Sequence, residues 1–117
     1  MPMALNVEAS LIEWLRDAGY DAYADVPADR PERFVTVERT GGSPHVGFDN
    51  PAVAVQAWAG SRLQASRDIT DIRDRMLLDL PKQPGFYHVS VDGLYNWPDP
   101  DSRQARYQLT ADITTAS

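Results

Sequence analysis

His88, Ser90 and Asp92 alternate along one predicted strand, so their side chains share one face of it. Together they offer a base, a hydroxyl and a carboxylate, the groups that nucleophilic catalysis requires. Residues two apart on a strand stand about 7 Å apart, however, which is too far for the hydrogen bond between nucleophile and base. No Gly-x-Ser-x-Gly elbow supplies an oxyanion hole either. A solvated strand face is the better interpretation of this set.

Other residue types that bind metals or phosphates also lack the required pattern. His45 has Asp49 four residues away, but a metal site needs a third and a fourth ligand, and the sequence offers no clustered partner. Four aspartates between residues 61 and 80 are balanced by four arginines, which favours an ion-paired helix surface. Gly41-Gly42 fits neither phosphate-binding glycine pattern. We therefore expect no catalytic, cofactor-binding or metal-binding residues, and a protein that is not an enzyme.

The composition predicts one soluble domain spanning residues 1–117. The chain has 43% apolar residues, no cysteine and a net charge of −6. These values exclude disulfides and thiolate zinc sites, and argue against a protein that grips nucleic acid phosphates. No run of apolar residues is long enough to span a membrane, and the N-terminal residues do not resemble a signal peptide. We expect an acidic protein of the cell interior.

Two helices must position any site. The segment 6–18 has apolar residues at helical spacing, with Asn6 placed to cap its first turn and Gly19 to end it. The segment 61–80 opens with the capping box Ser61-x-x-Gln64 and stops at Pro81. Its predicted apolar stripe comprises Leu63, Ala65, Ile69, Ile72, Met76, Leu77 and Leu80.

Five extended segments complete the pattern. A short one is expected within 21–26, a half-buried strand at 34–39, and a central strand covered on both faces at 52–59. Turn residues predict a long loop over about 40–50. Alternation predicts a C-terminal hairpin over about 86–114, with Tyr87, Val89 and Val91 facing inward and Gly93 at a bulge. The fold class is therefore α+β in the order α-β-β-β-α-β-β, with one mainly antiparallel or mixed sheet and two helices packed on one face.

The predicted 40–50 loop is long for a hairpin connection, and such loops are uncommon unless functional. The candidate interface residues are His45, Val46, Phe48 and Asp49 in this loop and Trp97 beside Pro98. Apolar and aromatic side chains in prominent loops are typical of contacts between proteins. The alternative, a loop folded back on its own sheet, stays open.

Three segments carry a resemblance to a known family. They are 35–42 (VTVERTGG), 49–59 (DNPAVAVQAWA) followed by an amphipathic helix, and 97–113, with WPDP at 97–100 and RYQLTADI at 106–113. In these segments the chain resembles the tail terminator proteins of long-tailed, siphovirus-type phages, above all those of actinobacterial phages. A composition with ten arginines and one lysine agrees with such a source.

The resemblance implies a structural protein of the virion. Terminators of this kind are small α/β domains that form a six-membered ring on the finished tail tube, stop its polymerisation and join the tail to the head. The implied partners are further copies of the chain, the tail tube protein and a head-completion or stopper protein of the neck. The implied location is the head-proximal end of the tail, after assembly in the host cytoplasm. The family has no catalytic or cofactor residues to transfer.

Elementary physics adds two expectations to this resemblance. A ring needs a heterologous interface, in which two different patches on each subunit meet. Genomic DNA would pass through the ring without specific binding, because a bore lined by part of the negative charge repels it; a bore lined by arginines would contradict this.

Three alternatives remain open at this stage. One is a head–tail stopper or joining protein of the neck. The second is a small host enzyme that uses His88 with Asp92, and the third is a ligand-binding domain, which needs a roomy apolar pocket.

Overall fold

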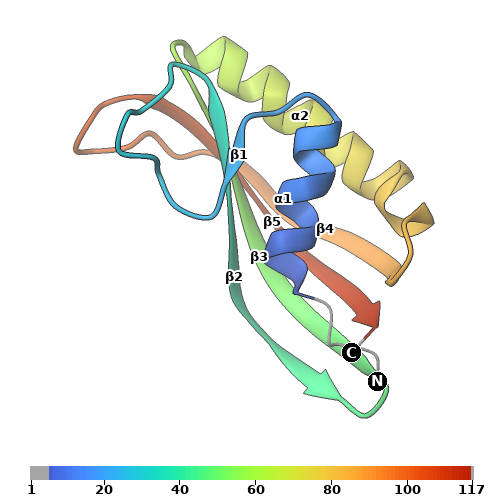
Figure 1. Ribbon diagram of the computed structural model, residues 1–117. Coiled ribbons are helices and arrows are strands. Elements are labelled where there is room, and N and C mark those ends of the chain that lie inside the picture. The colour runs from blue at the N-terminus through green and yellow to red at the C-terminus, as the bar shows by residue number, and fades with distance from the viewer. Residues whose placement is uncertain (1–5, 117) are drawn as a thin grey trace.

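The computed structural model describes residues 6–116 and confirms the α+β class and the predicted element order (Figure 1). Neither α1 nor any other helix within those residues has the length and apolar character needed to cross a membrane. The elements are α1 (Val7–Asp17), β1 (Ala22–Tyr23), β2 (Phe34–His45), β3 (Phe48–Ala59), α2 (Arg62–Leu78), the 3₁₀ helix η1 (Leu80–Lys82), β4 (Phe86–Asn96) and β5 (Ala105–Ala116).

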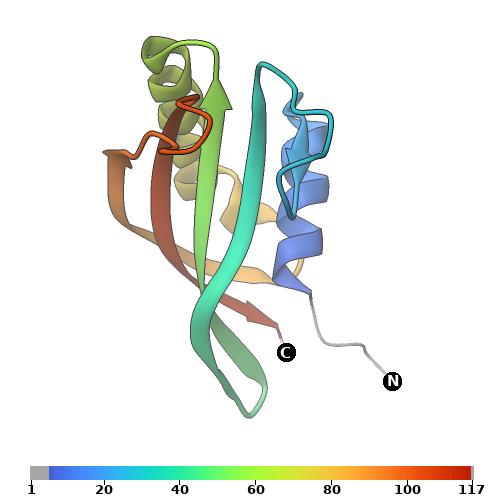
Figure 2. The ribbon, with the colours of Figure 1, turned by 90° about the vertical axis from the view of Figure 1, so that its left-hand side faces the viewer.

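The strands form one mixed sheet in the order β1-β2-β3-β5-β4. The β1–β2 pair is parallel and the other three pairs are antiparallel. Both helices pack on one face of the sheet, whereas, within the described residues, the opposite face meets only the connections 24–33 and 97–104 near one end (Figures 1 and 2). The molecule thus has a covered sheet face, which holds the core, and an uncovered one.

The ends of α1 are fixed as the sequence predicts. The Asn6 side chain accepts a hydrogen bond from the Ala9 N–H (3.1 Å), which satisfies a free donor of the first turn. Gly19 adopts a φ of +97°, and the Tyr20 N–H donates to the Leu15 carbonyl (3.0 Å), closing the helix. Between these caps Leu11 and Leu15 are fully buried against the sheet.

The predicted stripe of α2 is only partly correct. Ala65, Ile69, Ile72 and Met76 are buried, and Leu80 is buried within η1. Leu63 and Leu77, however, are 61% and 42% exposed. The helix rests on a single sheet, so only a narrow stripe is covered, and these two leucines lie outside it at 100° per residue.

Only one of the two hydrogen bonds of the predicted capping box forms. The Ser61 side chain accepts from the Gln64 N–H (3.2 Å), but the Gln64 amide donates to Asp68 (2.9 Å) instead of returning to the cap. Asp68 was expected on the solvated side of the helix, and this expectation is wrong. Its side chain is 5% exposed and receives two hydrogen bonds from Arg33 at 2.8 and 2.7 Å. This bidentate pair ties the connection before β2 to α2.

The predicted loop over 40–50 is also wrong, because β2 and β3 continue through it as a ribbon. The only turn between them is Val46-Gly47, where Gly47 has a φ of +87°. Gly41 and Gly42 were expected in a turn. They lie in β2 instead, where they accommodate a shift in register between Arg39 and Gly41. At Gly42, a Cβ atom would lie 2.0 Å from the Asn50 carbonyl oxygen, so the close approach of the two strands requires glycine.

The C-terminal hairpin is confirmed, with one inward residue assigned wrongly. Tyr87 is 62% exposed, because a register shift between Phe86 and His88 turns its side chain outward; Phe86 and Val89 are buried as a result. Val91 is half-buried against the core, as predicted. A second shift lies between Val91 and Gly93, where the bulge was expected.

The Arg33–Asp68 pair generates a first prediction. Arg33→Met leaves a buried carboxylate without its cation, so the free energy of unfolding should fall by about 2 kcal/mol in urea titrations. The control is Arg73→Met at the exposed Arg73–Asp74 pair, which should change it by less than about 0.5 kcal/mol. Equal effects of the two variants would contradict this role of Arg33.

Candidate functional site

The continued parts of β2 and β3 form an element that we call the arm, residues 40–50. It projects from the end of the sheet at the bottom of Figures 1 and 2. The strands remain paired to the tip, from Gly41 opposite Ala52 to His45 opposite Phe48. The end of β5 pairs with the part of β3 that belongs to the arm. Every residue from 40 to 48 is exposed. The arm is therefore an ordered strand ribbon whose side chains face mostly solvent.

An ion pair at its base stiffens the arm. The Arg39 guanidinium donates to both carboxylate oxygens of Asp49, at 2.7 and 3.0 Å, and also to the Gly41 carbonyl (3.0 Å). These hydrogen bonds hold the pKa of Asp49 below its usual range. The stabilisation is thus present above the pKa of an unfolded aspartate and is lost as the pH falls through the lowered value. Asp49, a candidate interface residue, is half-buried and engaged within its own chain.

The other three candidates of the arm gather at its tip. Val46 is fully exposed, and Phe48 is 38% exposed with its ring stacked on the His45 imidazole (centroids 4.6 Å apart, planes 15° apart). Burial of a valine or phenylalanine side chain stabilises by about 1.5–3 kcal/mol relative to exposure. The tip thus presents apolar surface, on a preformed support, that a partner would bury with net gain.

Trp97 lies at the other end of the sheet, so the structure does not bring the five candidates together. At the end of β4 next to Trp97, Asn96 lies opposite Tyr107 of β5. At the other end of β4, Phe86 lies opposite Thr115 of β5. Thr115 in turn pairs with Asp49 of the arm. Trp97 itself is 45% exposed, and its N–H donates to the Arg106 carbonyl (2.9 Å), which extends the β4–β5 pairing.

Around Trp97 the structure assembles a group that sequence reasoning missed. The Arg106 guanidinium lies 4.3 Å from the Trp97 ring centre and 4.7 Å from that of Trp58, and the Arg30 guanidinium lies 5.2 Å from the Trp58 ring. The Tyr95 ring is next to Trp97, at 6.4 Å. We call Tyr95, Trp97 and Arg106 the Trp97 patch. Alternation places Arg106 on the uncovered face, but only the register between β3 and β5 reveals its partner Trp58.

A ladder of hydrogen bonds crosses the centre of the uncovered face. Trp58 donates to Thr36 (3.0 Å), Thr36 to Gln56 (2.6 Å) and Gln56 to Gln108 (2.6 Å), and Gln108 donates to the Tyr95 hydroxyl. These side chains come from four adjacent strands and satisfy one another, which explains the lone glutamine in apolar β3. The ladder also holds Tyr95 in place within the Trp97 patch.

The residues considered for catalysis lie along β4, beside β5. His88 lies opposite Thr114 and Ser90 opposite Asp112, while Asp92 sits at the register shift. The neighbouring Asp112 carboxyl raises the pKa of Asp92. Within residues 6–116, no three histidine, aspartate or glutamate side chains gather as a metal site would need.

Comparisons with known proteins add no family to this description: the chain matches no protein-family model, and no curated protein is significantly similar to it.

The ion pair at the base of the arm generates a second prediction. Asp49→Asn removes the charge that binds Arg39, so amide hydrogen exchange across residues 41–48 should accelerate by roughly tenfold, while the central sheet is unchanged. Asp74→Asn, at an exposed pair on α2, is the matched control and should leave the arm as it is. Unchanged exchange in the Asp49 variant would show that the ion pair does not order the arm.

Proposed function

We propose that this protein is a tail terminator: a non-enzymatic subunit that forms a ring at the head-proximal end of a long phage tail. The ring caps the tail tube, stops its polymerisation and joins the tail to the neck. Its partners are further copies of the same chain, the tail tube protein and a head-completion or stopper protein.

The observation that carries this proposal is the arm. A subunit that assembles with copies of itself and with a tube needs rigid contact elements that lose little entropy on binding. The arm is held in place by strand pairing to its tip and by the Arg39–Asp49 pair, and it presents Val46 and Phe48 to solvent. Such a tip suits a contact made on assembly.

The segments that resemble the family support the same proposal, because they form the base of the arm and contribute Trp97 and Arg106 to the Trp97 patch. Residues 35–42 and 49–59 form most of β2 and β3 and the base of the arm, whereas residues 43–48 of the arm lie outside them. Residues 97–113 hold Trp97 and Arg106 of the Trp97 patch. The resemblance thus includes the exposed Trp97 as well as core positions, and does not extend to the arm tip.

The charge of the chain agrees with a ring through which DNA passes. A net charge of −6 for each subunit gives an assembled ring a strongly anionic character. DNA would be repelled from a bore lined by part of this charge and would not be held there. A bore lined by the arginines in an assembled ring would contradict this part of the proposal.

The alternatives differ from a terminator in the partner that they must bind or in the reaction that they must catalyse. A stopper or joining protein of the neck would bind portal complexes in preference to tail tubes. A host enzyme would depend on His88, which is exposed and lies opposite Thr114. His88→Ala should therefore leave assembly intact if the chain is a terminator, and abolish activity if it is an enzyme.

A ligand-binding domain, the third alternative, would need a roomy apolar pocket. One hollow of about 410 Å³ between the end of β3 and the start of α2 is lined mainly by polar side chains, with Glu32, Arg33 and Gln64 among them. That lining offers an apolar ligand little surface.

The proposal is tested by mixing the purified protein with tail tubes that are still elongating. The wild type should bind tube ends and stop elongation, whereas Val46→Asp should lose most of this effect because it places a charge on the apolar tip. Leu78→Asp, at an exposed leucine at the end of α2, is the control and should cap like the wild type. A wild type that binds portal complexes and leaves tubes unaffected would replace the terminator with a stopper.

A further inference from the structure

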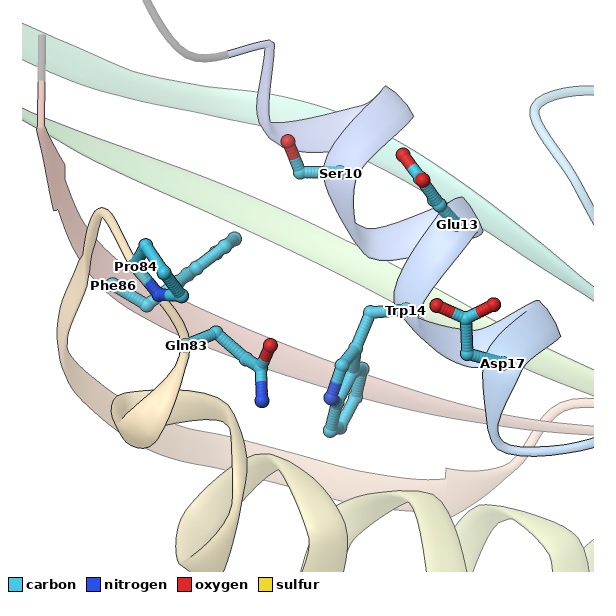
Figure 3. A pocket seen from close by; sticks show the side chains of 7 residues that line it. All are labelled: Ser10, Glu13, Trp14, Asp17, Gln83, Pro84 and Phe86. Atoms are coloured by element: carbon cyan, nitrogen blue, oxygen red, sulfur yellow. The ribbon is translucent and has the colours of Figure 1, made fainter.

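A groove of about 210 Å³ runs beside α1 on the helical side of the molecule (Figure 3). One wall is the helix, with Ser10, Glu13, Trp14 and Asp17, and the other is the segment after η1, with Gln83, Pro84 and Phe86. The Trp14 indole extends from α1 across the groove toward Gln83 (Figure 3). We call this feature the α1 groove.

The other two tryptophans of the chain indicate what such a ring accepts. Arginine guanidinium groups lie 4.3–5.2 Å from the ring centres of Trp58 and Trp97. Among the described residues, no arginine lies over Trp14 in the same way. Trp14 is half-buried against the core, and the part of its ring that lines the α1 groove has no cation over it.

Two carboxylates line the α1 groove, and neither has a cation within ion-pair distance in residues 6–116. They are Glu13 and Asp17, both exposed. Asp17 is the last residue of α1, where the negative end of the helix dipole disfavours a carboxylate. Arg16 in the same turn offsets part of this cost, and a cation bound in the groove would offset more of it.

The start of α2 shows the opposite pattern. Arg62 and Arg67 are exposed and, among the described residues, have no carboxylate within ion-pair distance. Arg62 stands in the first turn of α2, where the positive end of the dipole disfavours a cation and no acidic residue compensates. Beside them Leu63 is 61% exposed and, with Ser66 and Tyr107, lines a hollow of about 400 Å³. We call Arg62, Leu63, Ser66, Arg67 and Tyr107 the α2 surface.

We propose that the α1 groove of one copy binds the α2 surface of the next copy, with an arginine of that surface lying over Trp14 between Glu13 and Asp17. The two surfaces share no residue, as a heterologous, ring-closing contact requires. Asp17 in the groove and Arg62 on the α2 surface each carry a charge that the dipole of their own helix disfavours. The contact brings these opposite charges together. This inference rests on the proposed ring and names the surfaces through which it closes.

Charge reversal on either side tests the contact. The groove variant is Glu13→Arg with Asp17→Arg, and the surface variant is Arg62→Glu with Arg67→Glu. In either variant alone, like charges meet at every contact, so self-association should weaken by roughly a hundredfold in sedimentation experiments. In an equimolar mixture, basic grooves meet acidic surfaces and acidic grooves meet basic surfaces. The mixture should therefore assemble again, with the two variants alternating around the ring.

The controls separate this inference from the proposed function. Asp25→Arg with Asp29→Arg makes the same change in charge on exposed carboxylates of the 24–33 connection, and should assemble like the wild type. Circular dichroism establishes that each variant folds. If the wild type assembles only on tail tubes, the same comparison is made there.

Each outcome decides between the two claims. Variants that assemble like the wild type, or a mixture of folded variants that fails to recover, would overturn the groove contact and leave the ring in place. A wild type that stays monomeric both in solution and on tail tubes would overturn the proposed function, and this inference with it.

Discussion

The antiparallel pairing of β2 with β3 is the interaction on which the rest of the structure depends. From Phe34 opposite Trp58 to His45 opposite Phe48, a single ribbon serves two purposes. Its first half supplies Val35, Val37 and Val55 to the core beneath the helices. Its second half leaves the core and becomes the arm. The strand pairing runs through both halves and is interrupted by a register shift between Arg39 and Gly41, so the position of the arm tip follows from the packing of the core.

The second constraint is that two helices cover only one face of the sheet. The uncovered face cannot be left as bare apolar surface, and the chain stabilises it in two ways. Near one end, Arg30 and Arg106 lie over Trp58 beneath the connections that meet there. Across the centre, the ladder from Trp58 to Tyr95 pairs side chains whose burial would otherwise be costly. Both devices also position Trp97 and Tyr95 at the surface.

Much of the fold could be predicted from the sequence because local signals specify it. Helix caps, alternation and the last hairpin depend on residues within a few positions of one another. The arm was missed because glycine and proline at 41–44 are typical of turns, and only pairing with β3 shows that they lie in a strand. The burial of Asp68 was missed for the same reason, since its partner Arg33 is 35 residues away. Of the candidate site, Val46 and Phe48 were predicted from their apolar character, whereas Arg106 required the register of the sheet.

The central claim is that the chain is built to assemble into a closed ring. The most direct test is native mass spectrometry of the purified wild type over a concentration series, together with negative-stain images of the same samples and of mixtures with tail tubes. The account predicts rings with a central hole, of six subunits as the family resemblance implies, in free solution or on tube ends. A protein that remains monomeric at every concentration and also on tail tubes would contradict it.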